Sequence, residues 1–190
     1  MPILGILASA QPGNLSVLAY DSIATTTVGA GGSSTISFSS IPSTYKHLQL
    51  RYLARDTTGV ADITGIVLRF NSDSGSNYTR HYLLSDGGGP YGGVSGSTTY
   101  INGGLVVSGG TAASIFATAV IDILDYSDTN KYKTYKVLSG AETNSTSPKG
   151  YIDYESALWR STSAVSSITI TLATGNYAQY SQFALYGIKG

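Results

Sequence analysis

The C-terminal stretch, residues 166–190, constrains the fold more than any other part of the chain. Ile168, Ile170 and Leu172 alternate with threonines, Thr174-Gly175-Asn176 breaks the run, and Ser181–Lys189 then alternates with both faces largely apolar. Period-two alternation is typical of β-strands, and a strand that is apolar on both faces belongs inside a sheet layer rather than at a wet edge. We therefore predict that Ser181–Lys189 is a central strand of a two-layer all-β domain.

Short alternating runs, separated by turns rich in Gly, Asn, Asp and Ser, recur from Tyr20 onward. They cover residues 21–28, 34–39, 46–56, 62–71, 78–84, 100–107, 114–125, 131–138 and 151–160. The first two flank Gly29-Ala30-Gly31-Gly32 and are interpreted as a hairpin-like pair. No helical stripe appears, and about ten strands at this short spacing predict an all-β, two-layer antiparallel β-sandwich with jelly-roll connectivity.

Two stretches without alternation are predicted to be loops. Asp86–Ser97 is rich in glycine and carries Tyr91, and Ser139–Gly150 is polar. Long loops in compact domains are usually functional or mobile. We expect the first loop to face neighbours or solvent, with Tyr91 as a partner-binding residue.

Residues 1–19 are predicted to form an apolar arm ahead of a single domain at residues 20–190. The arm carries Ile3, Leu4, Ile6 and Leu7, and Gln11-Pro12-Gly13-Asn14 interrupts its apolar character. Two interpretations stay open: an edge strand of the chain's own domain, or an arm that docks on a neighbouring subunit by strand addition. Residues 1–10 lack a basic region and are too short to span a bilayer, so we expect no signal peptide and no membrane segment.

Composition narrows the partner classes. The net charge is zero and the Lys and Arg residues are scattered, which argues against binding of nucleic acid through its phosphates. The chain has no cysteine, which excludes disulfides, zinc–thiolate sites and thiol nucleophiles. Only 12% of the residues are charged, and a surface rich in Ser, Thr, Gly and Tyr suits protein or sugar partners.

Candidate catalytic residues have simpler explanations. The chain lacks a Gly-x-Ser-x-Gly motif, and His47 and His81 fall in predicted strands as surface or cross-strand residues. The carboxylate pairs are Asp153 with Glu155 on one strand face, and Asp122 with Asp125 at a strand end. Glycosidases need two carboxyl groups that face a cleft, and we favour salt bridges or solvated positions for these four.

Candidate ligand-binding residues divide into an acidic turn and a set of tyrosines. Asn71, Asp73, Gly75 and Asn77 have the spacing of a calcium loop but lack its closing acidic residue, so we favour a turn and expect no metal or other cofactor. Sugar stacking remains open for the tyrosines, which also pack well in sheets: Tyr91, Tyr100, Tyr126, Tyr132, Tyr135, Tyr151 and Tyr154.

Five segments together resemble one family: MPILGILAS, FSSIPSTYKHLQLRYLARD, LRFNSDSGSNYTRHYL, IDILDYSDTNKYKTYKVLSG and FALYGIKG. Their pattern, spread over nearly the whole chain, is similar to small β-rich virion proteins of tailed bacteriophages. The resemblance implies a structural subunit on the outside of the particle, made in the host cytoplasm, and does not decide between capsid and tail.

From these observations we expect a non-enzymatic subunit that decorates the capsid, is anchored by its arm and contacts other virion proteins. A homo-oligomer such as a trimer is expected because symmetric interfaces multiply weak contacts. The alternatives are a tail module that binds a receptor or a host glycan, and a glycan-active enzyme with two converging carboxyl groups.

Overall fold

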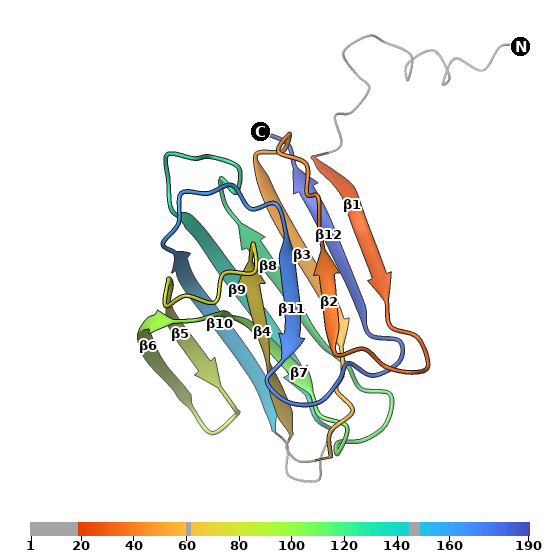
Figure 1. The fold of residues 1–190 in the computed structure, drawn as a ribbon. Helices are drawn as coiled ribbons and strands as arrows, with labels where there is room; N and C mark the ends of the chain where they lie inside the picture. Colours follow the sequence, from red (N-terminus) through yellow and green to blue (C-terminus); the bar gives the residue numbers. More distant parts are fainter. Residues whose placement is uncertain (1–18, 60–61, 145–148) are drawn as a thin grey trace, which may run out of the picture.

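The computed structural model describes residues 19–59, 62–144 and 149–190, which form two antiparallel β-sheets packed face to face (Figure 1). The larger sheet has eight strands, in the spatial order β1 (Tyr20–Thr27), β12 (Gln182–Ile188), β3 (His47–Ala54), β8 (Ala117–Ile123), β9 (Lys133–Glu142), β10 (Gly150–Trp159), β5 (Tyr78–Ser85) and β6 (Pro90–Thr98). The smaller sheet has four, in the order β2 (Thr35–Phe38), β11 (Ile168–Leu172), β4 (Ile63–Phe70) and β7 (Ile101–Val107). The predicted all-β sandwich of two antiparallel layers is confirmed.

The chain alternates between the layers instead of completing one sheet before the next. Strands β1 and β3 lie in the larger sheet, whereas β2 and β4 lie in the smaller one. At the other end of the chain, β11 pairs with β2 and β4, and β12 pairs with β1 and β3. Strands β9, β10, β5 and β6 extend the larger sheet beyond β8. The jelly-roll connectivity stays a prediction, with which this alternation is compatible.

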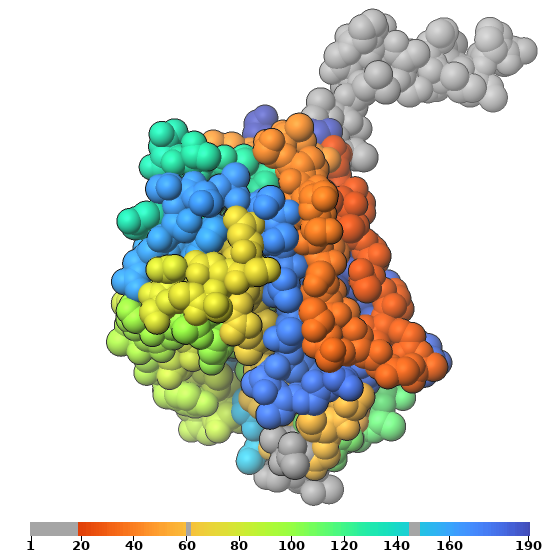
Figure 2. All heavy atoms as spheres, viewed as in Figure 1, coloured from red at the N-terminus to blue at the C-terminus, as the bar shows by residue number. Residues whose placement is uncertain are grey.

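The C-terminal strand is internal, as predicted. Strand β12 pairs with β1 on one side and β3 on the other, and Phe183, Ala184 and Leu185 are buried in it. The C-terminal strand β12 thus connects the edge strand β1 to the rest of the larger sheet. Figure 2 shows the side of the smaller sheet, where β2 (orange) and β11 (blue) lie side by side.

The hairpin predicted for residues 21–39 is wrong. Strands β1 and β2 belong to different sheets, and the connection at residues 28–34 crosses from one layer to the other. Gly32 adopts a φ of 69°, which favours glycine, so the turn signal in the sequence is real. A turn in the sequence does not determine whether the strands on either side of it pair with each other. Here β1 pairs with β12 and β2 pairs with β11.

The loop predicted at Asp86–Ser97 is also wrong, because Pro90–Thr98 forms the edge strand β6. Glycines normally weaken a strand, but the ring of Tyr82 on β5 covers Gly93, its partner across the strand pair. A Cβ atom at Gly93 would lie 2.7 Å from Cε1 of Tyr82. Similarly, β9 extends to Glu142, which shortens the predicted loop at Ser139–Gly150.

Aromatic side chains fill the core beneath β9 and β10. The ring of Phe70 on β4 meets Trp159 at 5.5 Å and Tyr135 at 6.0 Å, both edge to face. Trp159 also stacks on Tyr78, with ring centroids 6.3 Å apart. Such pairs contribute about 0.5–1.5 kcal/mol each beyond the area that they bury. This cluster fixes the inner face of the larger sheet and thereby sets which side chains point outward.

Candidate docking face

The predicted partner-binding residues lie in two places. Ile3, Leu4, Ile6 and Leu7 fall outside the described residues. Tyr91 lies on the edge strand β6 rather than in a loop, and its side chain is exposed. Its cross-strand partner is Leu84.

The carboxylates Asp153 and Glu155 share one face of β10, as predicted, but that face is the inner one. Both side chains are fully buried. Oε1 of Glu155 accepts hydrogen bonds from Nη1 of Arg80 at 2.7 Å and from Nδ2 of Asn102 at 2.5 Å. The predicted salt bridge is therefore present for Glu155, whereas a solvated position is wrong for both residues.

Burial changes the acidity of this pair. Desolvation raises the pKa of Asp153, and desolvation together with the neighbouring Asp153 charge raises the pKa of Glu155 to about 7. Neither carboxylate oxygen of Asp153 has a hydrogen-bond partner among the described residues. Two adjacent buried carboxyl groups with a single arginine are most stable when they share a proton. The pair is a buried proton-binding group, not two carboxyl groups that face a cleft.

Asp122 and Asp125 occupy separate environments. Asp122 points outward from β8 and accepts a hydrogen bond from Nε2 of Gln49 at 2.7 Å. Asp125 follows the strand and pairs with Lys131 at 2.8 Å and Lys46 at 2.9 Å. Hydrogen bonds from these two lysines lower the pKa of Asp125 to about 2. Asp125 thus organises a charged turn, as the predicted salt bridge implies.

The acidic turn after β4 uses its side chains internally. Asp73 accepts hydrogen bonds from the backbone N–H of Gly75, from Nδ2 of Asn77 and from Nε1 of Trp159, the last at 2.7 Å. Asn71 bonds the segment before β11 through both its amide nitrogen and its oxygen. Among the described residues, no group of three or more His, Asp or Glu side chains is placed to hold a metal ion.

The tyrosines considered for sugar stacking divide by burial. Tyr126 and Tyr135 are fully buried and serve the core. The exposed ones are Tyr91, Tyr100, Tyr132 and Tyr154, while Tyr151 is half-buried and donates its hydroxyl to Asp62 at 3.4 Å. Of these, Tyr154 lines a hollow in the surface.

The outer face of the larger sheet carries a continuous apolar row. It runs in register across four neighbouring strands and consists of Val120, Leu138, Tyr154 and Leu83. We call these residues the apolar row. Leu138 and Leu83 are 54% and 53% exposed, and Tyr154 is 43% exposed. Inward positions of these strands already supply the core, so the row exposes apolar side chains that the sandwich itself does not use. Contiguous exposed apolar surface of this kind marks interaction sites.

Two shallow hollows flank the row. One of about 280 Å³ lies between Tyr154, Leu138 and Asp122, and another of about 300 Å³ lies between Leu138, Ile152 and Thr118. Ile152 lies two residues before Tyr154 on the same face of β10 and is 62% exposed. Hollows of this size are at the lower end of small-molecule sites, and they suit apolar side chains that anchor a partner.

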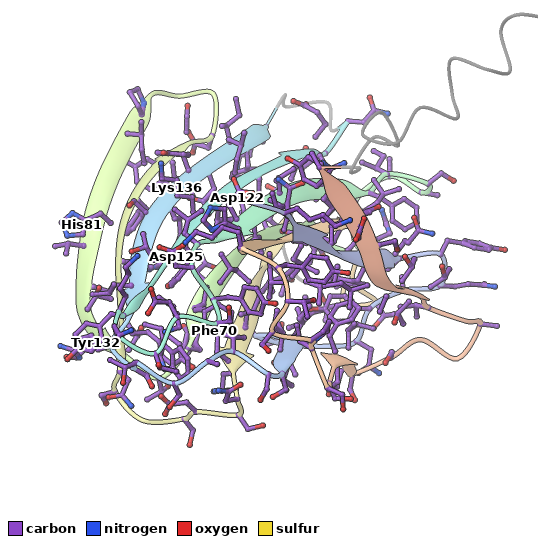
Figure 3. The ribbon with its side chains drawn as sticks, turned by 90° about the horizontal axis from the view of Figure 1, so that it is seen from above. Phe70, His81, Asp122, Asp125, Tyr132 and Lys136 are labelled. Carbon is purple, nitrogen blue, oxygen red and sulfur yellow. The ribbon has the colours of Figure 1, made fainter. Side chains whose placement is uncertain are left out.

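A polar border lies beside the row. Asp122 and Lys136 are direct cross-strand neighbours, and Figure 3 shows them side by side. Nε of Arg51 donates a hydrogen bond to Oε1 of Gln49 at 2.6 Å, and Nε2 of Gln49 donates in turn to Oδ1 of Asp122. The guanidinium of Arg51 lies 5.4 Å from the ring of Tyr20 and 5.2 Å from that of Tyr186. An apolar centre with a polar border is the usual anatomy of a protein interface.

The sequence contained a signal for the row that strand patterning alone did not bring out. Leu138, Tyr154 and Leu83 occupy positions that alternate with more deeply buried residues along their strands. Their combination became visible only through the register of β8, β9, β10 and β5, which are distant in sequence. Of the row, only Tyr154 was considered from the sequence, as a sugar-stacking residue, and Val120, Leu138 and Leu83 were missed.

Comparisons with known proteins add little. No family model and no curated protein matches the chain. A protein of unknown function from Shewanella oneidensis MR-1 aligns with 88% of this chain and 75% of its own, at 11% identity and a TM-score of 0.23. A legume lectin-like domain from Entamoeba histolytica covers 94% and 93% at 11% identity, with a TM-score of 0.15. These similarities are too low to support an argument. No helix in the described part of the chain is long and apolar enough to cross a membrane.

Proposed function

We propose that the chain is a non-enzymatic structural subunit on the exterior of a tailed-phage virion, with capsid decoration favoured over the tail. The observation that carries the proposal is the apolar row on the outer face of the larger sheet. Contiguous exposed apolar surface marks a binding site, so we expect the subunit to act by docking. The resemblance of the sequence to small phage virion proteins supplies the particle context.

The chain's other features agree with a docking role. Two of the candidate carboxylates form ion pairs within the chain: Glu155 binds Arg80, and Asp125 binds two lysines. The uncharged apolar segment at residues 3–7 provides a second attachment element, through which the subunit is anchored to its partners. Row and arm together give one subunit two contacts, and repeated contacts in a symmetric assembly multiply weak affinities.

A second candidate is a tail-associated module that binds a receptor or a glycan. It is favoured by Tyr154, whose exposed ring lines the same hollow as Asp122 and Lys136. An aromatic platform beside hydrogen-bonding side chains is suited to a sugar ring. This candidate predicts that Tyr154→Ala abolishes glycan binding while the thermal midpoint of the protein is unchanged.

The experiment that tests the first candidate is immunogold electron microscopy of particles purified from the source lysate, with antibody against the folded protein. The proposal predicts gold on the particle surface and co-sedimentation of the chain with particles. Label on the capsid supports decoration, and label confined to the tail favours the second candidate. A chain that remains entirely in the unsedimented fraction contradicts both.

A further inference from the structure

We propose that the apolar row of one copy receives the N-terminal segment 3–7 of a neighbouring copy, so that each subunit both gives an arm and accepts one. The inference rests on the proposed function only in treating the outer face as a docking surface. It goes further in naming the occupant of that face.

The chemistry of the segment matches that of the row. Residues 1–10 contain no charged side chain, and Ile3, Leu4, Ile6 and Leu7 are branched aliphatics. The two hollows beside Leu138 are lined mainly by apolar side chains and have the size for such anchors. Removing such aliphatic side chains from water favours association in proportion to the apolar area that they bury. Two or three of them suit a specific but reversible contact.

The length of the arm and the point where it joins the sheet permit this contact. Ala19 accepts a hydrogen bond from the backbone N–H of Lys189, next to the start of the edge strand β1. Residues 7–19 reach at most about 40 Å when extended. The row is centred on β9 and β10, five strand positions from β1 at most, which is about 24 Å at the usual spacing between strands. The chain's own row therefore lies within reach, and so does the row of any adjacent copy that comes within about 40 Å of Ala19.

The arrangement of charges favours a neighbour over the chain's own face. Between β1 and the row, Arg51 lies between the rings of Tyr20 and Tyr186. An arm that folded back over its own sheet would have to cover this exposed guanidinium before it reached Leu138. An arm from another copy can approach the apolar half of the sheet directly. Such giving and accepting closes as a two-fold dimer when two copies exchange arms, and as a ring such as the expected trimer when the arms pass in one direction around three copies.

The test uses full-length chains with one substitution each. Leu138→Glu places a charge in the row, and Ile6→Glu places one in the arm. Leu138 already points into solvent, so its replacement leaves the core intact. Tyr132→Glu is the matched control, because Tyr132 is 52% exposed and lies apart from Asp122 and Lys136 in Figure 3. The solution mass of each protein is measured by analytical ultracentrifugation over a range of concentrations.

The inference predicts that the wild type and Tyr132→Glu associate and that Leu138→Glu and Ile6→Glu each lose at least tenfold in association. A mixture of the two variants regains association, because one supplies an intact arm and the other an intact row. If Ile6→Glu still associates and Leu138→Glu does not, two rows pack face to face and the inference fails. A monomeric wild type, or a mixture that stays monomeric, also overturns it. None of these masses depends on whether the chain is found in a particle, so the proposed function stands or fails separately.

Discussion

The buried pair Asp153–Glu155 should make the stability of the fold depend on pH. Desolvation and the neighbouring Asp153 charge raise the pKa of Glu155 from its ordinary value of 4.5 to about 7 in the folded protein. The folded state therefore holds a proton more tightly than the unfolded chain. Between these two values the unfolded chain binds fewer protons, so stability falls as the pH rises from about 4.5 to about 7 and is then constant.

The size of the effect follows from the two pKa values. At about 1.4 kcal/mol for each pKa unit, the full difference is about 3 kcal/mol. From about pH 5.5 to about pH 8, the part lost is about 2 kcal/mol. Because Glu155 is fully buried, solvent does not screen this effect. For a chain of this length the loss lowers the melting temperature by about 4–8 °C.

The assay is thermal unfolding followed by circular dichroism at several pH values between these limits. Glu155→Gln keeps an oxygen for Arg80 and Asn102 and offers Asp153 a donor, so we expect a smaller fall in stability with pH. Glu142→Gln is the matched control, since Glu142 is exposed on β9, and it should retain the wild-type slope. A wild-type melting temperature that stays level or rises from about pH 5.5 to about pH 8 refutes the reasoning. An undiminished slope in Glu155→Gln would do the same.

Three further substitutions test other buried polar contacts. Lys133 is fully buried, and its ammonium group donates hydrogen bonds to three loop carbonyls. Lys133→Met should therefore lower the free energy of unfolding, measured in urea, by about 2–3 kcal/mol. An unchanged urea midpoint would contradict this role. Arg55 donates five hydrogen bonds to the loop at residues 109–115, and since lysine cannot reproduce this fork, Arg55→Lys should make the loop the first site of limited proteolysis. Trp159→Phe removes the indole N–H that binds Asp73 and should cost about 2 kcal/mol at neutral pH in chemical denaturation, with a loss below about 0.5 kcal/mol as the contrary result.

The layered β architecture could be predicted because it depends on local alternation. Ile168, Ile170 and Leu172 alternate with threonines in the sequence and bury the same side of β11 in the structure. The internal position of β12 could be predicted because both of its faces are apolar. A strand that is apolar on both faces is covered by protein on both sides, and β12 lies between β1 and β3. Both features depend only on the order of apolar and polar residues within one strand, which can be read directly from the sequence.

Pairing between distant segments could not be predicted in the same way. Tyr82 stabilises the glycine-rich β6 from a neighbouring strand, so Pro90–Thr98 has too little local signal to be recognised. Asp153 and Glu155 sit on a face whose burial is decided by the strands packed against it, not by β10 itself. The apolar row likewise exists only once β8, β9, β10 and β5 lie in register. These features arise from contacts between residues far apart in sequence.

The outer face of the larger sheet should become covered when copies assemble. The chain has no cysteine, so a single introduced thiol reports on its own surroundings. We would measure the rate of thiol labelling of Leu138→Cys and of the control Tyr132→Cys from dilute to concentrated solution. We expect the labelling of Leu138→Cys to slow at least fivefold with concentration while that of Tyr132→Cys stays constant. Equal and constant labelling rates at both positions would contradict it.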